Sequence, residues 1–284
     1  MKKIKRKHDF FRNFFKSKLA MTALILLVIE ILAMIFLPVI LDLDPYTSDI
    51  KAFNKEPSDR YIMGTDDIGR DMFARLLYGG RVSIFVGIAS TVISLVIGIP
   101  LGLLAGYYRG KWETIVMRMA DLFMSFPSMI LILVLVAIFG SSLNTVIWVI
   151  GVLGWTAVAK LIYGNVLSVR NKEYIEAAKA IGMSNRKIII SHILPNTIAP
   201  VWVSLPFTVS QAIMSEAALS FLGMGVQSPE ASWGNIINSA QRYIVLSSRP
   251  WQWIPAGVML IITVILINLV GEGIRDAFDP KMKH

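Results

Sequence analysis

The chain has 284 residues, of which 55% are hydrophobic and only 17% are charged, and its mean hydropathy is +0.62. A soluble domain rarely carries so few charges and so much apolar surface, so we expect a protein that crosses a membrane several times. The absence of cysteine excludes disulfides and thiolate metal sites. The formal net charge of +9 is explained by basic cytoplasmic loops rather than by nucleic-acid binding.

The N-terminal segment is basic and aromatic, and an apolar run at 19–41 follows it. This run is too long for the hydrophobic region of a signal peptide and lacks a small-residue cleavage site, whereas about 20 apolar residues span a bilayer. It predicts an uncleaved first span whose N-terminus is cytoplasmic, with the basic segment on the anionic inner leaflet. Glu30 falls inside this span, where an acid either serves transport or hydrogen-bonds to a partner helix.

Residues 42–80 are polar and rich in aspartate, which predicts an external loop. Met72, Phe73, Leu76 and Leu77 recur at helical spacing, so we expect a short amphipathic helix on the membrane surface. The acids lack the spacing of a calcium loop, and local ion pairs on a solvated face are the better interpretation.

Three spans are predicted in the next stretch of the chain. Residues 82–108 form the second span, and a short cytoplasmic turn at 109–118 follows it. Asp121 opens the third span, and a minimal external turn at 140–144 separates it from the fourth, which ends at Lys160.

A polar segment, YIEAAKAIGMSNRKIIISHILPN, occupies 174–196. Gly182 is placed to end a first short helix, because glycine accepts the left-handed backbone of a helix terminus. Ser184 is placed to cap a second helix, and Pro195 prevents a simple continuation. The segment therefore predicts a helix–turn–helix carrying basic side chains.

The fifth span begins after Pro195 and holds two prolines, which predict an irregular helix. Glu216 lies further along it and either contacts a substrate amine or pairs within the bundle. Residues 225–254 form an external loop whose tryptophans, Trp233, Trp251 and Trp253, suit the membrane interface. Contact of the same loop with a separate external protein is also left open, and the two roles are compatible. The sixth span covers 250–271. Of the 28 Lys and Arg residues, 20 fall in expected inside segments and eight in outside segments, which agrees with the positive-inside rule.

Three segments carry a resemblance to a known family. The spacing EAA, three residues, glycine, nine residues, one position and Ile-Leu-Pro closely resembles the signature loop of membrane subunits of ATP-binding-cassette (ABC) importers. That family commonly has isoleucine three residues before the proline, where this chain has His192. HILPN, MGTDDIGRDMFARLLYGGRVS at 63–83 and SEAALSFLGMGVQSPEASWG at 215–234 resemble the dipeptide and oligopeptide permeases, the C-type subunit in particular.

The resemblance implies an all-α membrane protein with six transmembrane helices in the type I ABC importer permease fold. Residues 1–80 would hold the N-terminal segment, first helix and external loop, 81–275 the transmembrane domain with a coupling loop at about 170–196, and 276–284 a cytoplasmic tail. The implied residues for ATPase coupling are Glu176, Ala177, Ala178, Gly182 and Pro195, and Glu216 and Glu30 are candidates for the translocation path.

The same resemblance implies a multi-pass protein of a prokaryotic cytoplasmic membrane with both termini inside. The expected partners are a homologous second permease subunit, two ATPase subunits that bind the ATP, an extracytoplasmic solute-binding protein and the peptide substrate. Neither a catalytic residue, a metal nor a cofactor is expected in this chain, and nucleic acid is not an expected partner.

Two alternatives remain open at this point. The same architecture could import nickel or a metal–chelator complex, since such permeases share these motifs. A remote alternative is an ion-coupled secondary transporter, but only Glu30 and Glu216 are mid-membrane acids. The chain has no GxxxxGK[ST] phosphate loop, HExxH or GxSxG motif, so the energy source is expected on another polypeptide.

Overall fold

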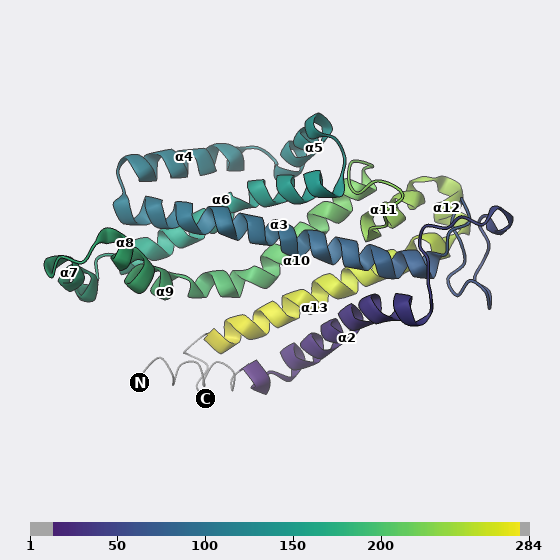
Figure 1. Ribbon diagram of the computed structural model, residues 1–284, viewed down its shortest axis with the longest axis horizontal. Coiled ribbons are helices and arrows are strands. Elements are labelled where there is room, and N and C mark those ends of the chain that lie inside the picture. Colours follow the sequence, from purple (N-terminus) through teal and green to yellow (C-terminus); the bar gives the residue numbers. More distant parts are fainter. Residues whose placement is uncertain (1–13, 279–284) are drawn as a thin grey trace.

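The computed structural model describes residues 14–278, and the regular secondary structure of this part is helical apart from one isolated bridge between Thr65 and Asp71. Four helices are long and apolar enough to cross a membrane, and six spans result if each of two bent helix pairs counts as one. The long helices lie side by side, with α7 and α8 at one end of the molecule and α11 and α12 at the other (Figure 1). We name these the α7 end and the α11 end.

The first and last long helices pack against each other at one side of the bundle (Figure 1). They are α2, Lys18–Ile40, and α13, Ile254–Phe278. The last helix therefore starts four residues later than expected and runs beyond 271, because Pro250–Gln252 form a separate 3-10 turn, η4. Deep between the two helices, the Thr263 hydroxyl donates a hydrogen bond to Glu30 Oε1.

The third helix, α3 (Met72–Tyr108), is a single element of 37 residues. Asp71 starts it, since its Oδ1 accepts hydrogen bonds from the backbone N–H of Phe73 at 2.7 Å and of Ala74 at 3.2 Å. The separate surface helix expected around Met72 is wrong, because no helix-breaking residue divides it from the span. The helix also runs through the expected domain boundary at 80–81.

Helix α6 (Leu143–Val169) packs along α3. The two backbones approach closely because glycines line the contact. A Cβ placed on Gly102 would lie 2.6 Å from the Ala159 carbonyl oxygen and 2.8 Å from Ile162 Cβ. Small residues let helix backbones approach in this way within lipid. The pair forms the centre of the bundle.

The expected third span is broken into two helices, α4 (Lys111–Ser125) and α5 (Ser128–Phe139), which meet at 91°. Phe126 between them is extended, as expected for a residue that precedes proline. Two corrections follow: residues 111–118 belong to α4 rather than to a turn, and Asp121 lies inside that helix instead of opening a span.

A second bend of 60° separates the helical segment Asn185–Thr197 from α10, Ala199–Phe221. The helix continues through Pro195 by way of a π-helical turn at Ile189–Ile193 and the short helix α9, Leu194–Thr197. The expected irregularity of this span is present, and the bend falls at Ile198 rather than at Pro195.

The α11 end is closed by two segments that are distant in sequence: the loop 41–71, and a chain of short helices after α10. These are α11 (Trp233–Asn238), η3 (Ser239–Gln241) and α12 (Tyr243–Ser248). Trp233 is fully buried, and its indole N–H donates to the Leu76 carbonyl at 3.0 Å. Its expected place at the membrane interface is therefore wrong: it fastens α11 to α3.

Candidate functional site

The segment at the α7 end is a helix–turn–helix that projects beyond the bundle (Figure 1). Helix α7 covers Glu173–Ala180. Gly182, whose φ is +77°, turns the chain just after it. The Gly182 N–H donates to the Lys179 carbonyl at 2.9 Å and the Met183 N–H to the Ala178 carbonyl at 3.1 Å. This pair of bonds is the Schellman ending that favours glycine, so Gly182 makes the turn expected of it.

Helix α8 (Asn185–Ile188) follows, with Ser184 in the N-cap position. Ser184 therefore lies at the expected position, but its side chain makes no capping hydrogen bond, and the cap expected of it is wrong. Pro195 stands near the start of α9, where a proline ring is tolerated because no N–H is needed.

The two alanines of the EAA motif face opposite ways. Ala178 is buried, and it packs with Ile175, Ile188 and Ile193 in the core that joins the loop to the bundle. Glu176 and Ala177 are exposed. Both alanines were expected to offer a docking surface. Ala177 is available to a partner, whereas Ala178 is buried and holds the loop together.

Ile181 was not singled out from the sequence, yet it is the most exposed large apolar residue of this loop, with 78% of its surface accessible. It lies in the C-cap position of α7, directly before Gly182. Together with the exposed Glu176 and Ala177, it is available to a partner. Helical periodicity could not have found it, because position 181 lies three residues after the buried Ala178, on the same face of a helix, and it is exposed because α7 ends there.

Polar contacts connect the loop to the end of α3. The Tyr107 hydroxyl donates to Asn185 Oδ1 at 2.7 Å, and the Lys179 ammonium lies 5.5 Å from the centroid of the Tyr107 ring. Arg170 Nη1 also donates to the Gly106 carbonyl at 3.4 Å. The loop is thus a rigid extension of the membrane helices.

A cavity of about 360 Å³ opens on the membrane part of the bundle between α3, α5, α6 and α10. Its polar lining consists of hydroxyls and one amide: Ser90, Thr91, Ser94, Ser128, Ser204, Thr208, Gln211 and Ser215. No charged side chain lines it. Most of these hydroxyls donate to backbone carbonyls, so their oxygens remain as acceptors for N–H groups of a solute, whatever its charge.

Neither intramembrane acid lies on this cavity. Glu216 is fully buried, and it accepts hydrogen bonds from the hydroxyls of Ser83 at 2.8 Å and Ser220 at 2.7 Å. Glu30 is bound by Thr263, and its Oε2 is buried without a hydrogen-bond partner. For both acids this placement favours pairing within the bundle, the alternative left open by the sequence, over contact with a solute.

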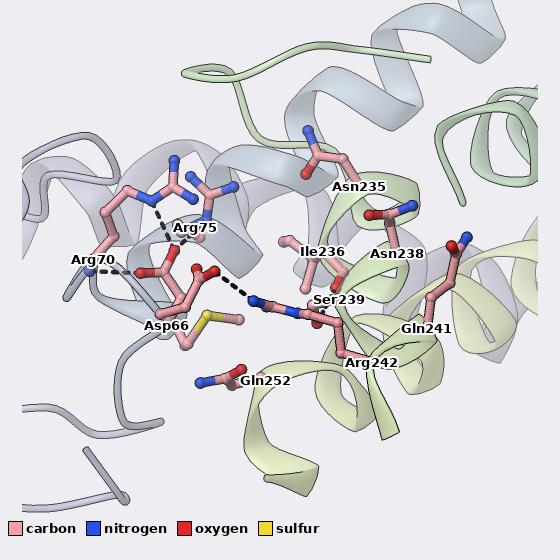
Figure 2. Close-up of a pocket in the computed structure, with 12 residues that line it drawn as sticks. Asp66, Arg70, Arg75, Asn235, Ile236, Asn238, Ser239, Gln241, Arg242 and Gln252 are labelled. Carbon is pink, nitrogen blue, oxygen red and sulfur yellow. Dashed lines mark hydrogen bonds and ion pairs between the residues drawn. The ribbon is translucent and has the colours of Figure 1, made fainter. Parts of the chain in front are cut away.

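A second pocket, of about 320 Å³, lies at the α11 end. We name it the outer pocket. Its lining is mostly charged or amidic: Asp66, Asp67, Arg70, Met72, Arg75, Asn235, Ile236, Asn238, Ser239, Gln241, Arg242 and Gln252. Figure 2 shows Asp66, Arg70 and Arg75 on one side of the pocket, and on the other side Asn235, Asn238, Gln241 and Arg242.

Ion pairs line the outer pocket, as expected for this loop. Arg70 Nε lies 2.7 Å and Arg75 Nε 3.7 Å from Asp66 Oδ2, and Arg242 Nη1 lies 2.6 Å from Asp67 Oδ2. In the described part of the chain, no group of three or more His, Asp or Glu residues could hold a metal ion. Beside the pocket, burial raises the pKa of Asp71, the carboxylate that caps α3.

The arrangement of helices defines the class of protein first. The fold is similar to that of the MetNI methionine ABC transporter in inward-facing form, with a TM-score of 0.60 and 21% identity over 73% of this chain and 98% of that chain. An amino acid ABC transporter matches with a TM-score of 0.54 and 14% identity over 72% and 94% of the two chains. The expected all-α, type I ABC importer permease fold is confirmed.

Sequence comparison then gives the family. Residues 98–284 match the model described as "Binding-protein-dependent transport system inner membrane component", and residues 6–57 match the "N-terminal TM domain of oligopeptide transport permease C". The chain belongs to this family of inner membrane transport components.

Its curated relatives carry names from peptide transport. The oligopeptide transport system permease protein OppC of Bacillus subtilis is 38% identical over 97% of this chain and 90% of its own length. The dipeptide permease DppC of Alkalihalophilus pseudofirmus is 39% identical over 96% and 89%. The glutathione permease GsiD of Pectobacterium atrosepticum is 36% identical over 97% and 91%.

Proposed function

We propose that this chain is the C-type membrane subunit of an ATP-driven importer of di- or oligopeptides, located in a prokaryotic cytoplasmic membrane. The observation that carries the proposal is the similarity to dipeptide and oligopeptide permeases over nearly the whole chain. The cavity supports the same substrate class, because hydroxyl and amide groups suit a peptide backbone whatever side chains it carries.

ATP is bound and hydrolysed by two separate ATPase subunits in this proposal. The helix–turn–helix at the α7 end is the element that docks on them, and Glu176, Ala177 and Ile181 are the exposed side chains that meet the partner. Ala178, Gly182 and Pro195 act indirectly, by fixing the shape of the loop.

A homologous second permease subunit completes the path. The cavity of this chain is open on one side, and a partner with a matching cavity would enclose a peptide-sized space. Closure of the ATPase pair would move both coupling loops and switch the space between inward- and outward-facing states. A solute-binding protein would deliver the peptide from outside.

The α7 end is cytoplasmic in this proposal. Basic residues gather there, including Lys172, Lys179, Arg186 and Lys187, and such residues favour the inside. Helix α2 starts and α13 finishes on the same side of the molecule (Figure 1), which supports cytoplasmic termini.

The proposal is tested by assembling the chain with two ATPases, a sister permease and a solute-binding protein from the same organism. Proteoliposomes should take up a labelled tripeptide only when ATP is enclosed with the ATPases. Ala177→Arg should reduce peptide-stimulated ATP hydrolysis roughly tenfold, because a long charged side chain enters a packed interface. Gly182→Val should act similarly, since a β-branched residue is strained at φ +77°.

Gly182→Asn is the matched control, because asparagine tolerates a left-handed backbone, and it should retain most of the coupled activity. All variants should insert and assemble with the sister permease. Normal coupled uptake in Ala177→Arg would contradict the docking role of the loop, and peptide-independent transport of another solute by the wild type would contradict the substrate class.

A further inference from the structure

The outer pocket has no part in the membrane cavity, since the two share no lining residue. It is formed where the loop 41–71 meets the short helices after α10. Gln252 fixes this junction from within, because its amide N–H groups donate to Asn54 Oδ1 at 3.0 Å and to the Thr65 carbonyl at 2.9 Å. Gln252 is 1% exposed, so buried hydrogen bonds hold the two walls of the pocket together.

The pocket carries an excess of positive charge. Three arginines and two aspartates line it, which leaves one positive charge without a counterpart in the lining. Asp66 is the ion-pair partner of both Arg70 and Arg75, and it is only 7% exposed. Because a buried charge is stable only when it is paired, a group with one negative charge would balance the lining near the buried Arg70 and Arg75.

Arg75 is the least satisfied of these cations. Its side chain is 6% exposed, yet its Nε lies 3.7 Å from Asp66, too far for a hydrogen bond. Among the described residues, the hydrogen bond recorded for its guanidinium is a long one, from Nη1 to the Pro45 carbonyl at 3.4 Å. A guanidinium has five N–H donors in a fork that matches a carboxylate.

Arg242 is the most exposed of the three arginines. Its side chain is 48% exposed, against 12% for Arg70 and 6% for Arg75, and its Nη1 pairs with Asp67. In Figure 2, Arg242 extends toward the side of the pocket that carries Asp66. Tyr243, which is 82% exposed, and Ile244 follow it directly in sequence, and tyrosine and arginine are enriched at the energetic centres of protein interfaces.

We propose that the outer pocket receives an Asp or Glu side chain of the docked solute-binding protein, whose carboxylate pairs with Arg242 in exchange for Asp67 and extends toward Arg70 and Arg75. This rests on the proposed function, and the match to a binding-protein-dependent transport family supports it. The position at the end opposite the coupling loop, and the exposed Tyr243 and Ile244 that follow Arg242, favour a protein side chain over the carboxylate of a free peptide.

The test exploits the opposite roles of Arg242 and Asp67. In the assembled transporter in nanodiscs, the Kd of the peptide-loaded binding protein is measured by biolayer interferometry. Arg242→Gln should raise this Kd roughly fivefold to tenfold, because it removes a charge partner of the entering carboxylate. Asp67→Asn should lower it roughly twofold or more, because it removes the internal competitor. Arg60→Gln is the control, since Arg60 is 77% exposed in the same loop and pairs with Asp49 outside the pocket.

Each outcome has one reading. If the Arg242–Asp67 pair only holds the loops together, both variants weaken binding alike, and the proposal is overturned. It is also overturned if Arg60→Gln acts as strongly as Arg242→Gln, which would indicate general charge attraction. An Arg242-dependent preference for a free over an amidated tripeptide, without the binding protein, would assign the pocket to the substrate instead. If the wild-type assembly does not bind the protein at all, the proposed function itself fails.

Discussion

Glu216 is a carboxyl group at the centre of a membrane helix bundle with none of its surface exposed. Burial of such a group is costly unless its oxygens are hydrogen-bonded. Hydroxyls of Ser83 and Ser220 donate to the two oxygens, and Ser83 Oγ also accepts from the backbone N–H of Trp233 at 3.2 Å. One side chain thus joins α3, α10 and α11.

Glu216→Ala should therefore lower stability, by about 2–4 kcal/mol, because it leaves two buried hydroxyls without their acceptor and opens a cavity. Glu216→Gln should lose less, since an amide keeps one acceptor oxygen and nearly the same volume. The thermal midpoint of the purified assembly in detergent measures the loss, and Glu272→Ala, at an exposed position of α13, is the control. Equal stability of Glu216→Ala and wild type would contradict this structural role.

Single residues of the loop show what a sequence can and cannot specify. The role of Gly182 could be predicted because a left-handed backbone selects for glycine whatever surrounds it. The division between Ala177 and Ala178 could not, because it depends on which face of α7 meets Ile188 and Ile193, and these residues belong to a different element.

At the scale of elements, the contact of α3 with α6 depends on glycine. Gly102→Val should destabilise the bundle by about 1–3 kcal/mol, because a side chain there meets the backbone of Ala159, which cannot move away. Gly164→Val is the matched control within α6, since a Cβ at Gly164 has nothing within 4 Å. Thermal midpoints of the two variants measure the difference, and similar values would show that α3 and α6 are not in close contact.

The connection of α3 to α8 gives a prediction on coupling. Tyr107→Phe removes the hydroxyl that binds Asn185 while keeping the ring beneath Lys179. Peptide-stimulated ATP hydrolysis should fall several-fold, about what the loss of one hydrogen bond of ~1 kcal/mol gives, with the binding-protein Kd unchanged. Tyr108→Phe, at the exposed neighbouring position, should have no effect on either value. A drop in both variants would point to general damage at the end of α3.

Hydropathy predicted the apolar segments well, since each of the six expected spans corresponds to a long helix or a bent pair. Hydropathy did not predict where the chain changes direction within a span. The 91° turn between α4 and α5 arises from the backbone restriction at Phe126 and Pro127, and an average over twenty residues does not register it. The burial of Trp233 also escaped prediction, because it depends on a contact with α3 about 150 residues away.

For the whole molecule, the absence of cysteine makes the orientation directly measurable. Ile181→Cys and Tyr243→Cys place single thiols at the two ends, at positions 78% and 82% exposed. In intact cells or spheroplasts, a membrane-impermeant maleimide should label only the thiol at 243, and permeabilisation should expose the thiol at 181. Reversed labelling would place the helix–turn–helix outside and contradict the proposed coupling to ATPases.

Helix α3 carries Arg75 of the outer pocket near one end and Tyr107, the contact to α8, near the other. Its 37 residues make a rod of about 55 Å, which exceeds the ~30 Å thickness of the hydrocarbon layer. Tilting a rod of this length by about 5° displaces one tip by about 5 Å relative to the other. In the proposed transporter, a solute-binding protein that docks at one tip and ATPase subunits that move at the other would therefore act on the same continuous helix.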